Sequence, residues 1–324
     1  MDKIKKILKL AVFLLCAVYI VKYFYANWDS LQIAFKINKL MIALIILLSI
    51  TTLITYAYRF KIIMHKCSGK NPPFWEWFKV IMLARFYNLF FAQSGNIYRG
   101  VELKRRFGIS YTDYVSASVS FGWMDICLDL IITGAIIILI RPEFKLGDFK
   151  AYQFVALLLL VIICLPILAD LLLKRISTNA SVLLWIKSKL SQVITATISN
   201  IKDLSYLAKI VIWGLLVAAQ TLIVYYILFT SFEIKLDIPS LMLFYALLKL
   251  SSAVIITPGN IGIQEIAFGV LSTQIGGGMA QGILISAISR VLGSSIIIIL
   301  ALILSGSGLF FKRKNITEID DVKS

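Results

Sequence analysis

The feature that most constrains the fold of this chain is the length of its apolar runs. An α-helix rises 1.5 Å per residue, so about 20 apolar residues cross a hydrocarbon core of roughly 30 Å. Six runs approach or exceed that length, at residues 7–25, 40–64, 114–140, 152–173, 206–230 and 279–311. The sequence therefore predicts an all-α polytopic membrane protein.

Composition excludes the main alternatives. Of 324 residues, 60% are hydrophobic and 15% are charged, whereas soluble domains average about 25% charged residues. A soluble enzyme, a disordered tail and a soluble nucleic-acid-binding domain are thereby excluded, although the net charge is +16. The single histidine, His65, and four cysteines without a Cys-x-x-Cys spacing predict no metal or cofactor site.

Two shorter apolar segments end in breaks. Residues 78–92 lead into Gln-Ser-Gly-Asn, and residues 241–256 lead into Thr-Pro-Gly-Asn before a second short run at 261–275. Such segments are too short to cross comfortably and are typical of re-entrant helices. The basic connectors, including the Lys104–Arg106 cluster expected after the first hairpin, indicate the cytoplasmic side. We therefore expect six full spans, two re-entrant hairpins and cytoplasmic termini in a cell membrane, inner or plasma.

The order of these segments suggests an inverted repeat. Residues 1–140 and 151–311 each contain two spans, a broken hairpin and a long span, and they enter from opposite sides. Ser-Gly-Asn-Ile at residues 94–97 recurs as Pro-Gly-Asn-Ile at 258–261. Internal symmetry of this kind is typical of transporters. The expected organisation is one membrane domain over residues 1–311 and a basic, polar cytoplasmic tail over 312–324.

Charged residues inside the spans mark the candidate site. Asp125 and Asp129 lie one turn apart on a stripe with Ser118 and Gly122, which should face a bundle interior or a wet cavity. They either pair with basic residues to hold helices together or act as cavity acids that bind a proton. Arg290 either pairs with Asp125 or Asp129 or clamps a phosphate. Lys249 could likewise pair with an acid or bind a phosphate, and for Lys249 the structural role of pairing is favoured.

The two breaks could also contact an anionic headgroup. Each begins a short helix whose backbone N–H groups and dipole favour negative charge. Together, the spans and breaks give the candidate substrate-binding residues Asn96, Arg99, Asp125, Asp129, Asn260, Gln264, Glu265 and Arg290.

Several of these motifs resemble a known family. Ser-Gly-Asn-Ile-Tyr-Arg at 94–99, Asp125 to Asp129, the stretch 258–265 and the Arg290 helix are similar to the transmembrane domain of lysylphosphatidylglycerol synthases and to stand-alone flippase-like proteins. The resemblance covers roughly residues 5–311. It departs from the family's acidic-Arg-x-x-Asp pattern at Ile126. The short stretch after the last span leads us to expect no soluble synthase domain.

The resemblance implies movement of a lipid between leaflets. The cargo would be an anionic or modified phospholipid, or a lipid-linked glycan precursor on polyprenyl phosphate. An alternative is a non-transporting accessory subunit of a synthase or glycosyltransferase that builds cell-envelope lipid or polysaccharide. A membrane glycosyltransferase is less favoured, because the first outer connector offers only Asp29 as an acid. We expect no enzymatic activity and no nucleic-acid partner.

Overall fold

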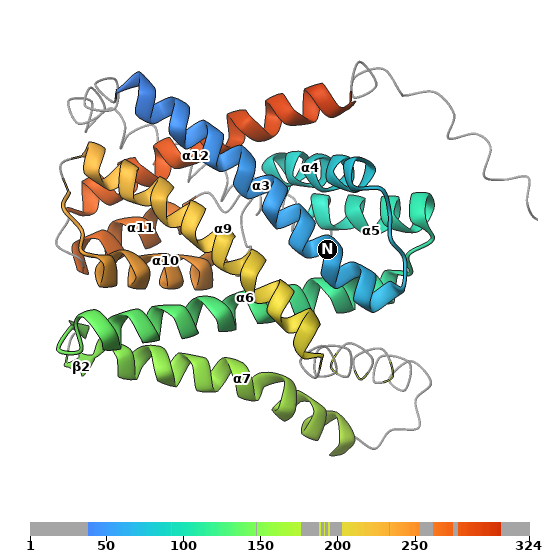
Figure 1. Cartoon of the computed structure of the whole chain (residues 1–324), viewed down its shortest axis with the longest axis horizontal. Coiled ribbons are helices and arrows are strands. Elements are labelled where there is room, and N and C mark those ends of the chain that lie inside the picture. Colours follow the sequence, from blue (N-terminus) through green and yellow to red (C-terminus); the bar gives the residue numbers. More distant parts are fainter. Residues whose placement is uncertain are drawn as a thin grey trace, which may run out of the picture.

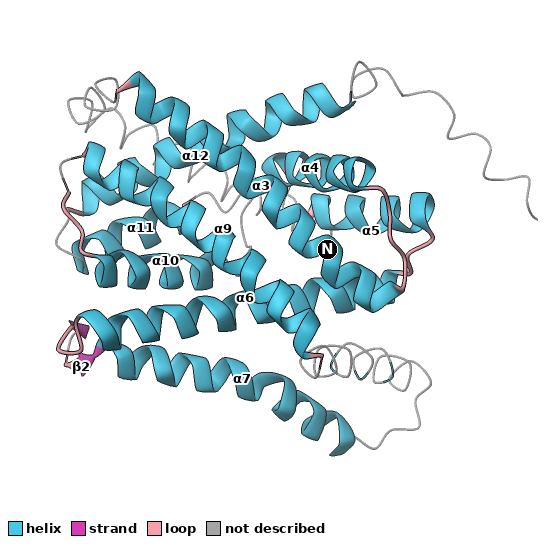
Figure 2. Ribbon diagram, in the orientation of Figure 1, coloured by secondary structure: helices cyan, strands magenta, loops and turns pink. Residues whose placement is uncertain are grey.

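The structure is a computed structural model dominated by helices (Figures 1 and 2). It describes residues 38–175 and 203–305 with gaps at 92, 147, 233, 253–261 and 275–277, together with residues 188, 191 and 194. The predicted span at 7–25, the predicted tail at 312–324 and Asn260 lie outside the described residues.

Within the described ranges, five helices are long and apolar enough to cross a membrane. They are α3 (Lys39–Ser68), α6 (Tyr111–Ile140), α7 (Ala151–Arg175), α9 (Leu204–Ser231) and α12 (Met279–Ser305). Each matches a run predicted from the sequence to within a few residues where it is described. Their exposed apolar side chains, such as Leu139 and Ile303, suit contact with lipid. The chain is thus a multi-pass membrane protein.

Four shorter helices form two adjacent pairs. The first pair is α4 (Phe74–Phe90) with α5 (Ser94–Phe107), and the second is α10 (Ile238–Ser252) with α11 (Ile263–Gln274). Their positions agree with the two broken segments of the sequence. The Lys104–Arg106 cluster, expected in a connector, instead lies in the last turn of α5. Basic side chains in that turn interact favourably with the negative end of the helix dipole.

Polar residues at the helix ends explain where several helices begin. Asn38, Ser110, Asp203 and Asp237 each accept a backbone N–H bond at the start of α3, α6, α9 and α10. These bonds satisfy donors that have no partner within the helix. Two antiparallel strands of two residues each, β1 (Lys145–Leu146) and β2 (Phe149–Lys150), join α6 to α7, where the sequence predicts only a connector.

The helices pack across the molecule in a crossed arrangement. The first pair contacts α12 through α4, and the second pair contacts α6 through α10, while α3 packs along α9. In Figure 1, α6 lies between α10 and α7. A buried aromatic cluster of Phe60, Trp77 and Phe121 joins α3, α4 and α6, and the Trp77 Nε1 donates to the Ala57 carbonyl at 2.8 Å. This packing positions the polar groups described next.

Candidate functional site

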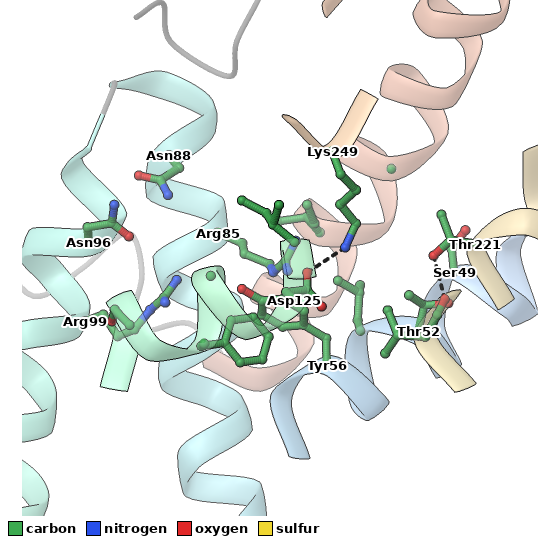
Figure 3. Close-up of a pocket in the computed structure, with 18 of the residues that line it drawn as sticks. Ser49, Thr52, Tyr56, Arg85, Asn88, Asn96, Arg99, Asp125, Thr221 and Lys249 are labelled. Atoms are coloured by element: carbon green, nitrogen blue, oxygen red, sulfur yellow. Dashed lines mark hydrogen bonds and ion pairs between the residues drawn. The ribbon is translucent and has the colours of Figure 1, made fainter. Parts of the chain in front are cut away.

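A cavity of about 930 Å³ opens between the long and the short helices. Polar and charged side chains from seven helices line it: Ser49, Thr52, Tyr56, Arg85, Asn88, Asn96, Arg99, Ser118, Asp125, Thr221, Lys249 and Ser289. Figure 3 shows Lys249 reaching from α10 toward Asp125, with Arg85 and Arg99 on the side of α4 and α5. A polar cavity of this kind among apolar helices is the usual place for a functional site in a membrane protein.

Asp125 is the centre of a buried charge network. The Arg59 Nη1 donates to its Oδ1, and the Lys249 Nζ donates to its Oδ2 at 2.7 Å. Lys249 also lies 3.4 Å from the Oδ2 of Asp129. Arg59 is 1% exposed and Asp129 is 2% exposed. The network therefore places two cations against two carboxylates in a region of low dielectric, where such pairing is required.

This network shows that the pairing expected for the two acids is present. Asp125 is paired with basic residues, and Asp129 faces one of them, but the partners are Arg59 and Lys249 rather than Arg290. The structural role favoured for Lys249 is found, because it joins α10 to α6. Asp125 and Lys249 also line the cavity, so the same groups hold helices together and face the open space.

Arg85 and Arg99 differ from the other cations of the site. Neither forms an ion pair within the described part of the chain, and the Nε of each is buried there without a hydrogen-bond partner. Arg85 lies 4.4 Å above the Tyr56 ring, and Arg99 lies 5.4 Å from the centre of the Phe60 ring. Aromatic faces stabilise a guanidinium group in part, but they supply no negative charge.

A second charged cluster lies at the start of α11. The Arg290 Nε donates to the Glu265 Oε1 at 2.6 Å, and its Nη2 donates to the Gln264 Oε1 at 3.2 Å. The other oxygen of Glu265 accepts the Gly262 N–H at 2.7 Å. These three predicted site residues do not line the cavity. The predicted set therefore divides: Asn96, Arg99 and Asp125 line the cavity, Asp129 adjoins it, and Gln264, Glu265 and Arg290 form a separate cluster.

The starts of the short helices are less open to an anion than the sequence suggested. At α5, the Gly95 N–H donates to the Asn88 Oδ1 at 2.7 Å, and the N–H groups of Asn96 and Ile97 both donate to the Gln93 carbonyl. At α11, Glu265 takes the corresponding role with its own negative charge. The chain's own groups thus satisfy these donors.

Gly95 explains how closely the first pair of helices can pack. A Cβ atom there would lie 1.9 Å from the Ala84 carbonyl oxygen, so only glycine permits the approach of α5 to α4. Gly122, in contrast, borders the cavity, and no atom lies within 4 Å of a Cβ added to it.

Sequence reasoning missed Arg59 and Arg85. Each interrupts an apolar segment, at residues 40–64 and 78–92, in the way that singled out Asp125. The same rule, that a charge inside an apolar run is expensive and therefore functional or paired, would have found both.

The comparisons with known proteins gave one match. The sequence matches the family described as "Lysylphosphatidylglycerol synthase TM region" over residues 6–302. No match was found among curated proteins or among solved structures.

Proposed function

The chain belongs to the lysylphosphatidylglycerol synthase TM region family, and from this premise we propose that it moves a phospholipid or a lipid-linked precursor between leaflets. The headgroup would occupy the cavity at Asp125 while the acyl chains stay in the bilayer. The family name suggests either an anionic phospholipid or its lysyl ester as cargo. The proposal does not include an enzymatic step.

The observation that carries this proposal is the polar cavity at the centre of the apolar helices. Its volume of about 930 Å³ is in the range that binds ligands the size of a headgroup. Four of the charged residues of the site, Arg85, Arg99, Asp125 and Lys249, border it directly. Charged groups are costly in hydrocarbon. Ion pairs that served only to hold helices together would need no cavity beside them, whereas a polar substrate does.

We further propose that the fold contains six spans and an inverted repeat, with both termini in the cytoplasm. The crossed packing supports this, since α4 of the first pair contacts α12 and α10 of the second pair contacts α6. An exchange of partners between halves is expected when a pseudo-two-fold axis relates them. The sixth span would be residues 7–25.

Narrowing the cavity tests the proposed function. Gly122→Leu places a branched side chain in open space one turn before Asp125, so we expect a folded protein whose cavity is narrowed beside that carboxylate. The purified full chain would be reconstituted in vesicles, and exchange of tail-labelled phospholipid between leaflets would be followed by quenching of the outer label. We expect exchange to be slower than with the unchanged chain.

Gly134→Ala is the control for changing a glycine of α6. A Cβ at Gly134 meets only the Val155 side chain of α7 at 3.5 Å, away from the cavity, so exchange should be unchanged. Full exchange by a folded Gly122→Leu variant would contradict the proposal. No exchange by the unchanged chain, together with co-purification of a synthase or glycosyltransferase, would instead favour the accessory role.

A further inference from the structure

The charges at the cavity do not balance. Among the described residues that line it or pair with its lining, Arg59, Arg85, Arg99 and Lys249 face Asp125 and Asp129. Four cations against two carboxylates leave a net charge of +2. Glu102, one turn after Arg99, does not compensate, because Arg105 and Arg106 take its carboxylate at 2.8 and 2.5 Å.

The excess positive charge is concentrated on Arg85 and Arg99. Arg99 is 8% exposed, and both guanidinium groups carry positive charge and line the same cavity. Each keeps a buried Nε–H without a partner within the described residues. Two like charges in a region of low dielectric, with unsatisfied donors, favour a ligand that brings negative charge and acceptor oxygens.

A phosphate group supplies both. The planar fork of an arginine matches phosphate oxygens in two parallel hydrogen bonds, so two arginines can hold one phosphodiester. Asn88 and Asn96 line the same side of the cavity (Figure 3). The Nδ2 of Asn88 is an additional donor, since only its Oδ1 is used by Gly95.

We infer that Arg85 and Arg99 form a phosphate subsite that selects headgroups of net negative charge. This inference rests on the proposed function and narrows it. Phosphatidylglycerol carries one net negative charge and would reduce the excess at the cavity. Its lysyl ester carries two ammonium groups and one net positive charge, and would add to that excess, so the chain selects against the ester to which the family name refers.

The inference is tested with the reconstituted full chain and three labelled lipids: phosphatidylglycerol, phosphatidylethanolamine and lysylphosphatidylglycerol. We expect exchange to be fastest for phosphatidylglycerol and slowest for the lysyl ester. Arg85→Gln with Arg99→Gln should slow phosphatidylglycerol exchange by roughly 30-fold or more, as expected when one side of a buried charge pair is removed. The single variant Arg99→Lys keeps the positive charge, so it should exchange phosphatidylglycerol faster than the double variant.

Arg105→Gln is the matched control. Arg105 lies on α5 like Arg99, but its side chain is 65% exposed and Arg106 still holds Glu102. Exchange and lipid preference should both stay unchanged in this variant. Thermal unfolding of every variant shows whether a loss of exchange reflects loss of the fold.

Binding separates this inference from the proposed function. Native mass spectrometry of the detergent-solubilised chain measures the binding of the same three lipids, with inorganic phosphate as a competitor. A preference for phosphatidylglycerol that disappears in the double variant supports the subsite even if no lipid is exchanged. Equal or tighter binding of the lysyl ester overturns the inference and leaves translocation standing. Binding of inorganic phosphate with no lipid preference identifies a soluble anion and overturns the lipid assignment.

Discussion

Asp125→Asn should destabilise the protein more than any exposed charge change. Asn keeps the shape of the side chain and one acceptor oxygen but removes the negative charge shared by Arg59 and Lys249. Arg59 is 1% exposed and loses the carboxylate it is bonded to, while Lys249 retains its contact with Asp129 at 3.4 Å. Breaking a buried pair from one side costs about 3–5 kcal/mol. Because the amide oxygen still accepts a bond, we expect about 3 kcal/mol.

A second substitution should return part of that loss. The net charge around the cavity rises from +2 to +3 in Asp125→Asn, and Lys249→Met brings it back to +2 in the double variant. The coupling energy between the two positions should then be about 1–3 kcal/mol, as found for residues in one buried network. Four chains are needed: the unchanged protein, each single variant and the double variant. Unfolding in detergent micelles supplies the free energies.

Lys66 and Asp203 provide the control pair. Their charged atoms are 2.6 Å apart, but the side chains are 41% and 40% exposed. Exposed pairs contribute less than about 1 kcal/mol, so Lys66→Met with Asp203→Asn should show little coupling. A coupling at Asp125 and Lys249 no larger than at this exposed pair would refute the reasoning that burial gives the network its strength.

Three further changes follow from single contacts. Gly95→Ala brings a Cβ to 1.9 Å from a carbonyl oxygen of α4; relief to about 3.3 Å requires the helices to separate, at a cost of about 1–3 kcal/mol in unfolding experiments. Gly122→Ala meets no atom within 4 Å and should stabilise α6 by up to about 1 kcal/mol. At Asp237, partial burial opposes ionisation, but bonds from Ser240 and Arg141 prevail and hold the pKa below its usual 3.8. Stability from this carboxylate is therefore present above pH 3.8 and is lost as pH falls through the lowered pKa, a dependence that Asp237→Asn should remove from unfolding curves measured against pH.

Helix positions were predictable because they depend on local pattern. The apolar runs at 114–140 and 206–230 gave α6 and α9, since residues that must avoid water over a membrane thickness are recognised without knowing their neighbours. The break at Ser94 likewise gave the start of α5, and the predicted break at 258–261 comes shortly before the start of α11 at Ile263. The C-terminal end of α5 was not predicted, because a basic cluster is compatible both with a connector and with the last turn of a helix, here one that ends at Phe107 and is capped by Gly108.

The partners of the charged residues were not predictable in the same way. Which cation meets Asp125 depends on whether α3, α10 or α12 packs against α6, and no pattern within α6 contains that information. Arg290 was therefore given Asp125 or Asp129 as an acid partner, when Glu265 lies on the adjacent α11. The pairing of the Gly95 N–H at the start of α5 was also missed, because its acceptor, Asn88, belongs to the preceding helix.

The two charged clusters have different consequences for how a headgroup could move. Glu265 and Arg290 neutralise each other within the adjacent helices α11 and α12, so this pair has no need to open when the proposed halves of the fold move apart. Asp125 instead joins Arg59 of α3 in its own half to Lys249 of α10 in the other half. If the proposed halves move apart as units, the bond of Asp125 to Lys249 breaks while its bond to Arg59 remains. An anionic headgroup beside Lys249 would replace the lost carboxylate, whereas a cationic one would leave the ammonium without a counter-charge. The selectivity inferred for the arginine subsite and the motion required for translocation thus favour the same cargo.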